Sequence, residues 1–172
     1  MKSFTELLEG VYDPNIFKAF FMAGGPGSGK SFAVQKGIGQ VQKGVRVTAQ
    51  GLKVVNSDDI FEKYLKDAQL DFKMQAGQKS ERDKLRTKAK EVTRKRQDNY
   101  IEGRLGMVID GTGKDYGKIT TQASGLKQLG YDVHMVFVNT SLDVALERNT
   151  QRPRQVPELS LIHIWRCRRC SR

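Results

Sequence analysis

Apolar residues gather in short runs along the chain, and stretches with helical spacing lie between these runs. The first run, residues 16–23, is almost continuously apolar, which is typical of a strand buried on both faces of a parallel sheet. The predicted strands cover 16–23, 54–55, 107–109 and 133–138. The predicted helices cover about 30–40, 60–65, 80–104, 119–129 and 141–149. Because strands and helices alternate, the pattern predicts an α/β domain with a mostly parallel sheet flanked by helices.

Some side chains in these elements have a predictable structural role. Ser57 or Asp58 can cap the helix that follows the second strand, and Gly130 can close the helix that ends near 129. His134 lies within the fourth predicted strand, where we expect a packed core histidine. A further short helix near the N-terminus is predicted by the capping-box pattern of Ser3 and Glu6.

Composition favours a folded protein that acts in water. The 172 residues are 28% charged and 38% hydrophobic, which is typical of a globular chain. No apolar run approaches the roughly 20 residues that cross a bilayer, and no signal-peptide pattern opens the chain. We therefore expect a cytoplasmic protein without membrane contact.

The C-terminal end differs from the rest of the chain. Four arginines and both cysteines lie in its last 14 residues, and residues 159–169 resemble the translation of a sequencing-library adapter. One CxxC pair, at Cys167 and Cys170, is weak evidence for a metal site. We expect three parts: an N-terminal helical extension (1–15), a domain at 16–158 that is incomplete at its C-terminus, and a non-native tail (159–172).

Net charge is +11, and it raises the question of nucleic-acid binding. The segment 79–104 holds ten Lys or Arg against five Asp or Glu, but the positive residues are spread around the predicted helix. Leu85, Val92 and Tyr100 are available to face the sheet. Nucleic acid is therefore a possible partner that the charge pattern does not favour.

The most specific motif follows the first strand. GGPGSGKS fits the Walker A pattern, in which glycines let successive backbone N–H groups surround a phosphate at a helix N-terminus. Lys30 should reach the β- and γ-phosphates of ATP, and the Ser31 hydroxyl should bind Mg²⁺. The predicted cofactor-binding residues are Gly24, Gly25, Pro26, Gly27, Ser28, Gly29, Lys30 and Ser31.

Acidic residues follow two other strands. Asp110 ends the third predicted strand, where it can orient the Mg²⁺ ion or cap a helix. Gly111 follows it where ATP-hydrolysing motors carry an acid, so an acceptor other than water is favoured. Of Asp58 and Asp59, we expect one to cap the helix and one to act as the base; Asp58 is our candidate for the base.

Two further predictions concern loops. Thr112 lies in a turn near the expected acceptor, and Asp59 is assigned to substrate binding. A basic loop after the fourth strand holds Arg148, Arg152 and Arg154, which is typical of a lid that stabilises a transferring phosphoryl group.

GGPGSGKS, NSDD, VIDGTG and RNTQRPRQVP, in this order, resemble the small P-loop kinases that include zeta toxins and 5′-hydroxyl polynucleotide kinases. The likeness covers roughly residues 16–157 and is greatest to zeta-toxin-like kinases of tailed phages. It implies ATP, Mg²⁺ and a hydroxyl acceptor, with Asp58 as base and Arg148 or Arg152 in the lid. Polynucleotide kinases carry an arginine three residues after the base, and here that position is Phe61.

The resemblance leaves three functions open. The first is an ATP-dependent phosphotransferase that acts on a sugar nucleotide or another small molecule. The second is a 5′-hydroxyl polynucleotide kinase, which Phe61 disfavours. The third is a nucleotide-binding protein without transfer activity.

Overall fold

The computed structural model describes residues 16–41, 46–70, 79–113, 115–151, 155, 156, 158 and 162. The strands are β1 (Lys18–Ala23), β2 (Lys53–Val55), β3 (Met107–Gly111) and β4 (Asp132–Phe137). The helices are α1 (Lys30–Gly37), α2 (Ser57–Asp67), α3 (Lys79–Glu102), α4 (Tyr116–Gln128) and α5 (Leu142–Thr150). The predicted N-terminal helix, Arg152 and most of the predicted tail lie outside the described residues.

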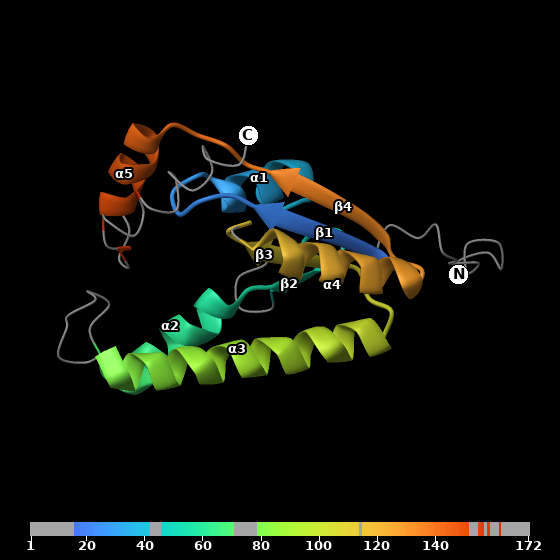
Figure 1. Cartoon of the computed structure of the whole chain (residues 1–172), viewed down its shortest axis with the longest axis horizontal. Coiled ribbons are helices and arrows are strands. Elements are labelled where there is room, and N and C mark those ends of the chain that lie inside the picture. Colours follow the sequence, from blue (N-terminus) through green and yellow to red (C-terminus); the bar gives the residue numbers. More distant parts are fainter. Residues whose placement is uncertain are drawn as a thin grey trace.

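The strands form one parallel sheet in the order β2-β3-β1-β4. Since the strands are parallel, their carboxyl ends meet at one edge of the sheet, where the start of α2 and the helix α5 also lie (Figure 1). This confirms the predicted α/β fold with a parallel sheet flanked by helices. In such a sheet, ligands bind at the carboxyl ends of the strands.

The sheet is covered by apolar side chains on both faces, which explains the unbroken apolar run of β1. Phe21 belongs to a cluster with Leu126 of α4, whereas Met22 belongs to a second cluster with Val34 of α1. Successive strand residues point to opposite faces, so both faces of β1 require apolar residues.

A third cluster holds α2 against α3 beside the sheet (Figure 1). Phe61 and Leu65 of α2 pack there with Ala89 of α3, and Leu85 packs against the same cluster. Our expectation that Leu85 faces the sheet is therefore wrong, whereas Tyr100 does pack against the cluster on the sheet. The amino-terminal part of α3 thus supports α2, which carries the NSDD segment.

Tyr131, just before β4, closes the core at the other end of the sheet. Its hydroxyl donates to the carbonyl oxygen of Leu105 at 3.2 Å, and its ring meets Phe17 edge-on with centroids 5.2 Å apart. Burial raises the pKa of the Tyr131 hydroxyl above 10.0.

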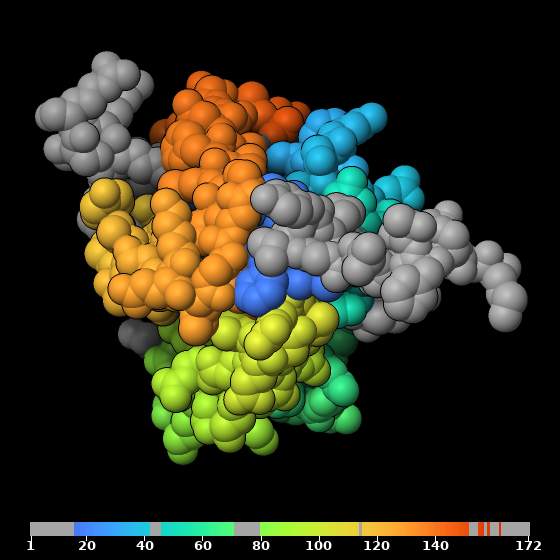
Figure 2. Space-filling view, turned by 90° about the vertical axis from the view of Figure 1, so that its right-hand side faces the viewer, coloured from blue at the N-terminus to red at the C-terminus, as the bar shows by residue number. Residues whose placement is uncertain are grey.

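The structure corrects the prediction for His134. Its side chain is 45% exposed, stacks on Phe20 and lies 2.9 Å from the Asp132 carboxylate. The reason is topological: β4 is an edge strand among the described strands and lies at the surface of the molecule, in orange in Figure 2. An apolar run does not reveal which strand takes the edge.

Two boundaries also differ from the prediction. Helix α1 ends at Gly37 rather than near 40, because the chain turns at Gly39 with a φ of 103°. The cap of α2 is Asn56, not Ser57, Asp58 or Asp59. Gly130 does follow the end of α4 with a φ of 91°, as a closing glycine should. In the part of the chain that the structure describes, no helix is both long enough and apolar enough to cross a bilayer.

Candidate active site

The loop between β1 and α1 has the geometry of an anion cradle. Gly27 and Gly29 have φ values of 80° and 94°, a region in which side chains with a Cβ are strained. A Cβ on Gly24 would lie 2.5 Å from the Ser28 hydroxyl oxygen, so the loop also needs glycine for space. Ser28 is buried, and its hydroxyl has no hydrogen-bond partner among the described residues. A polar group of this kind fits a loop that binds the oxygens of a phosphate.

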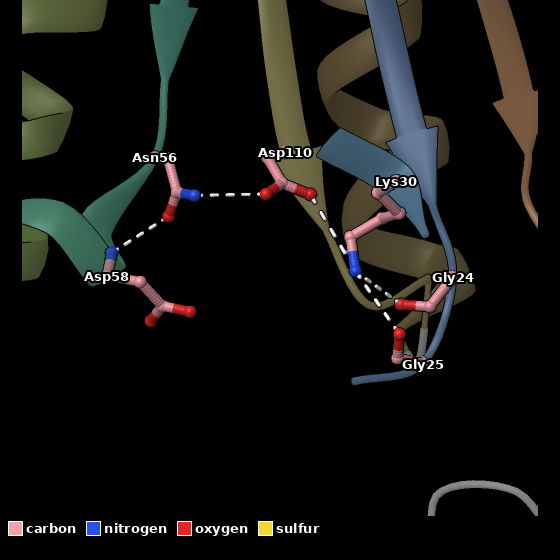
Figure 3. A network of polar contacts seen from close by, with 6 residues as sticks. All are labelled: Gly24, Gly25, Lys30, Asn56, Asp58 and Asp110. Carbon is pink, nitrogen blue, oxygen red and sulfur yellow. Dashed lines mark hydrogen bonds and ion pairs between the residues drawn. The ribbon is translucent and has the colours of Figure 1, made fainter. Parts of the chain in front are cut away.

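Lys30 brings a positive charge back over this loop. Its Nζ donates to the carbonyl oxygens of Gly24 at 2.9 Å and Gly25 at 3.4 Å, and it lies 3.9 Å from Oδ1 of Asp110 (Figure 3). The side chain is largely buried between the loop and β3. A fixed cation at the N-terminus of α1 is what the predicted phosphate contact requires.

Asn56 connects Asp110 to the start of α2. Its Nδ2 donates to Oδ2 of Asp110 at 3.0 Å, and its Oδ1 accepts from the backbone N–H of Asp58 at 2.8 Å. Figure 3 shows the resulting chain of contacts across the ends of β1, β3 and β2. Lys30, Asp110 and Asp58, three of the predicted site residues, thus lie at the carboxyl ends of three neighbouring strands.

The two acidic residues of NSDD point to different partners. The Asp58 carboxylate lies 2.5 Å from Nη1 of Arg86 on α3, and the guanidinium of Arg86 also lies over the Phe61 ring, 5.0 Å from its centroid. Asp59 instead forms an ion pair with Arg46 and lines a separate cavity of about 380 Å³. Both side chains of the Asp58–Arg86 pair keep more than a third of their surface exposed, at 39% and 34%.

A larger cavity opens beside this chain of contacts. It has a volume of about 1070 Å³ and lies between the end of β3 and the helices α3 and α4. Asp110 and Thr112 line it at the end of β3, Ser57 lines it at the start of α2, and Arg94 of α3 and Lys118 of α4 contribute cations. This volume is typical of a pocket for a small molecule.

Helix α5 reaches the phosphate loop from the far side. Nη1 of Arg148 donates to the carbonyl oxygen of Gly27 at 3.3 Å, and the backbone of Ala145 lies against the same glycine. Arg148 therefore lies beside the loop, and its role in a lid stays a prediction. Ser31 occupies the exposed first turn of α1, and Arg152 lies outside the described residues.

Our sequence predictions did not include Asn56 or Arg86 among the site residues. A signal for Asn56 was present, since asparagine directly before an acidic helix start is a preferred N-cap. Nothing in the sequence pairs Arg86 with Asp58, because 28 positions separate them and only the packing of α2 on α3 brings them together.

Comparisons with known proteins give a family match and matches to solved structures. The zeta toxin family matches residues 13–166. Among solved structures, a chain of the PezAT chromosomal toxin–antitoxin system of Streptococcus pneumoniae is 16% identical with a TM-score of 0.59, over 85% of this chain and 56% of that one. A chain of the Pnkp1/Rnl/Hen1 RNA repair complex is 15% identical with a TM-score of 0.60, over 90% of this chain and 45% of that one.

A chain of the AvrRxo1-ORF1:AvrRxo1-ORF2 structure with ATP is 17% identical with a TM-score of 0.62, over 85% of this chain and 43% of that one. This chain therefore spans about half the length of these solved chains. No curated protein matches it. At these identities the structures show a shared fold. Because the family match extends over most of the sequence, the chain belongs to the zeta toxin family.

Proposed function

We propose that this protein is an ATP-dependent kinase that transfers the γ-phosphate of ATP to a hydroxyl group of a small molecule, with a sugar nucleotide as the first acceptor to test. The observation that carries the proposal is the chain of polar contacts from Lys30 through Asp110 and Asn56 to the start of α2. A phosphate loop alone supports nucleotide binding. A second carboxylate held at the neighbouring strand ends supports transfer to a second molecule.

The residues of the loop fit the phosphates of ATP. The glycine cradle leaves room for phosphate oxygens, and the Ser28 hydroxyl and the Lys30 ammonium lie at this loop. Ser31 and Asp110 would hold Mg²⁺, which supplies charge neutralisation between the β- and γ-phosphates. Mg²⁺ usually takes only one or two protein ligands, in keeping with this small donor set.

Asp58 is the proposed general base. As the acceptor oxygen forms its bond to the γ-phosphorus, the bond from that phosphorus to the oxygen of ADP breaks, and the hydroxyl proton passes to the Asp58 carboxylate. Lys30 and Arg148 stabilise the negative charge on the transferring group. The acceptor is proposed to enter by the cavity of about 1070 Å³, which Ser57 lines directly before Asp58.

A 5′-hydroxyl polynucleotide kinase is the second candidate. Arg86 favours it, because this guanidinium lies beside Asp58 and over Phe61, the position at which the sequence lacks a cation. A guanidinium there would hold a phosphate next to the accepting hydroxyl. The third candidate remains a nucleotide-binding protein without transfer activity.

One labelling experiment separates the three candidates. The protein is given γ-labelled ATP and Mg²⁺ with either UDP-N-acetylglucosamine or a 5′-hydroxyl oligonucleotide, and ATP binding is measured in parallel. We expect label on the sugar nucleotide, a loss of about 100-fold or more in Asp58→Asn with ATP binding retained, and loss of ATP binding in Lys30→Ala. Label on the oligonucleotide alone would favour the second candidate. ATP binding without label on either acceptor would favour the third, and unchanged ATP binding in Lys30→Ala would refute the phosphate-loop assignment.

A further inference from the structure

Both polar atoms of the Asn56 side chain form hydrogen bonds within the candidate active site. Its orientation is fixed by chemistry, because the backbone N–H of Asp58 can only donate and must face the side-chain oxygen. The Nδ2 group therefore faces Asp110, whose carboxylate accepts. One short amide thus bonds to the end of β3 on one side and to the first turn of α2 on the other (Figure 3).

Capping α2 accounts for only half of this arrangement. An N-cap needs a side-chain oxygen that accepts from the helix, and serine, aspartate and asparagine supply it about equally well. Serine is too short to also reach the carboxylate, and an ionised aspartate has no proton to donate. Of the common capping residues, asparagine alone joins an acceptor to a donor at this length.

We infer that Asn56 is a positioning residue that holds the Asp110 carboxylate and the Asp58-bearing start of α2 in one fixed arrangement. With Oδ2 bound to Asn56, the other oxygen of Asp110 is directed toward Nζ of Lys30, 3.9 Å away. The backbone of Asp58 is fixed by the same amide, so the proposed base keeps its distance from the phosphate loop. This inference rests on the proposed kinase function and assigns Asn56 a role within it.

Substitutions of Asn56 can separate its capping of α2 from its hydrogen bond to Asp110. Asn56→Ser and Asn56→Asp keep a good cap but lose the donor to Asp110, whereas Asn56→Ala loses both. For each variant, the melting temperature is measured without nucleotide, ATP affinity is measured by calorimetry with Mg²⁺ and with EDTA, and release or transfer of the γ-label is measured at saturating ATP.

We expect Asn56→Ser to melt close to the wild type and Asn56→Ala to melt about 3 °C lower. Asn56→Asp should also melt lower, because its carboxylate would lie beside the carboxylate of Asp110 and repel it. In all three variants we expect kcat to fall about 10-fold and the gain in ATP affinity on adding Mg²⁺ to shrink, while affinity in EDTA stays unchanged. In a chain that carries Asp110→Asn, Asn56→Ser should not reduce the Mg²⁺ effect further, because the two residues act through one contact.

Two results would contradict the inference alone, and a third would contradict the proposed function. If Asn56→Ser keeps both wild-type kcat and the wild-type Mg²⁺ effect, Asn56 is a helix cap only and the inference is wrong. If Asn56→Ser loses activity only in proportion to a lower melting temperature, the inference is also wrong, because stability explains the loss. If the wild type itself binds no ATP, the proposed function fails, and the inference falls with it.

Discussion

Gly27 offers the sharpest test of how the phosphate loop is built. Its φ of 80° is unfavourable for alanine by about 1–2 kcal/mol. A Cβ at this position would also lie 2.5 Å from the carbonyl oxygen of Ala145 and 2.9 Å from its Cα. Both atoms belong to the backbone of α5, so no side-chain rotation relieves the clash, and overpacking of this kind adds about 1–3 kcal/mol.

We therefore expect Gly27→Ala to destabilise the protein by about 2–5 kcal/mol, which corresponds to a melting temperature roughly 4–20 °C lower. The shift of α5 should also break the hydrogen bond from Arg148 to the Gly27 carbonyl. Differential scanning fluorimetry measures the first effect, and the affinity for ATP should fall with it because the loop no longer keeps its curvature.

Gly37→Ala is the matched control. It adds the same methyl group at the last residue of α1, where an added Cβ meets nothing within 4 Å. Alanine is favoured over glycine in a helix by about 0.5–1 kcal/mol, so this variant should melt slightly higher than the wild type. A Gly27→Ala protein that melts and binds ATP like the wild type would refute the close approach of α5 to the loop.

Three further substitutions test other contacts. Ser28→Ala removes a buried hydroxyl without a partner among the described residues, so the melting temperature should hold or rise while calorimetry shows weaker ATP binding. Arg148→Gln should lower kcat about 100-fold while ATP affinity changes little, since a donor for the transferring group is lost. Tyr131→Phe tests the raised pKa of the Tyr131 hydroxyl. The stability that the neutral hydroxyl contributes is fully present below pH 10.0 and is lost above it. When unfolding is measured at several pH values, the wild type should therefore lose stability above pH 10.0 faster than the variant.

Local patterns sufficed for the parts of the fold that depend on neighbouring residues. The apolar run before GGPGSGKS predicted β1, since a strand buried on both faces needs such a run, and the glycines predicted the loop. Helix α5 was predicted with its first turn at Ser141, and this residue does cap it through the N–H of Val144. In each case the physical cause lies within a few residues of its effect.

Features that depend on the arrangement of distant elements escaped prediction. His134 lies in a run as apolar as the run of β1, and only the position of β4 at the edge of the sheet exposes it. The cap of α2 is Asn56, and its amide also bonds to Asp110 on another strand, a contact that the local sequence does not reveal.

The same limit applies to the choice of acceptor, where Phe61 and Arg86 have to be considered together. From the sequence, the apolar residue at 61 argues against a substrate with a phosphate next to its hydroxyl. In the structure, Phe61 is buried against α3, and its ring supports the guanidinium of Arg86 beside Asp58. A cation therefore lies near the proposed base after all, supplied by a different helix, and the absence of arginine at 61 no longer weighs against a phosphorylated acceptor.

The substitution Arg86→Gln tests whether Arg86 binds an anionic group of the acceptor. The Asp58–Arg86 pair is more than a third exposed, so its loss should change stability by no more than about 1 kcal/mol, and ATP affinity should stay the same. If Arg86 binds an anionic group beside the accepting hydroxyl, Arg86→Gln should raise KM about 10-fold or more for the acceptor that is labelled in the transfer assay. Arg86→Lys should have a KM between those of Arg86→Gln and the wild type, because lysine lacks the planar fork of donors. An unchanged KM with a lower kcat would contradict acceptor binding, and would instead mean that Arg86 serves to orient the Asp58 carboxylate.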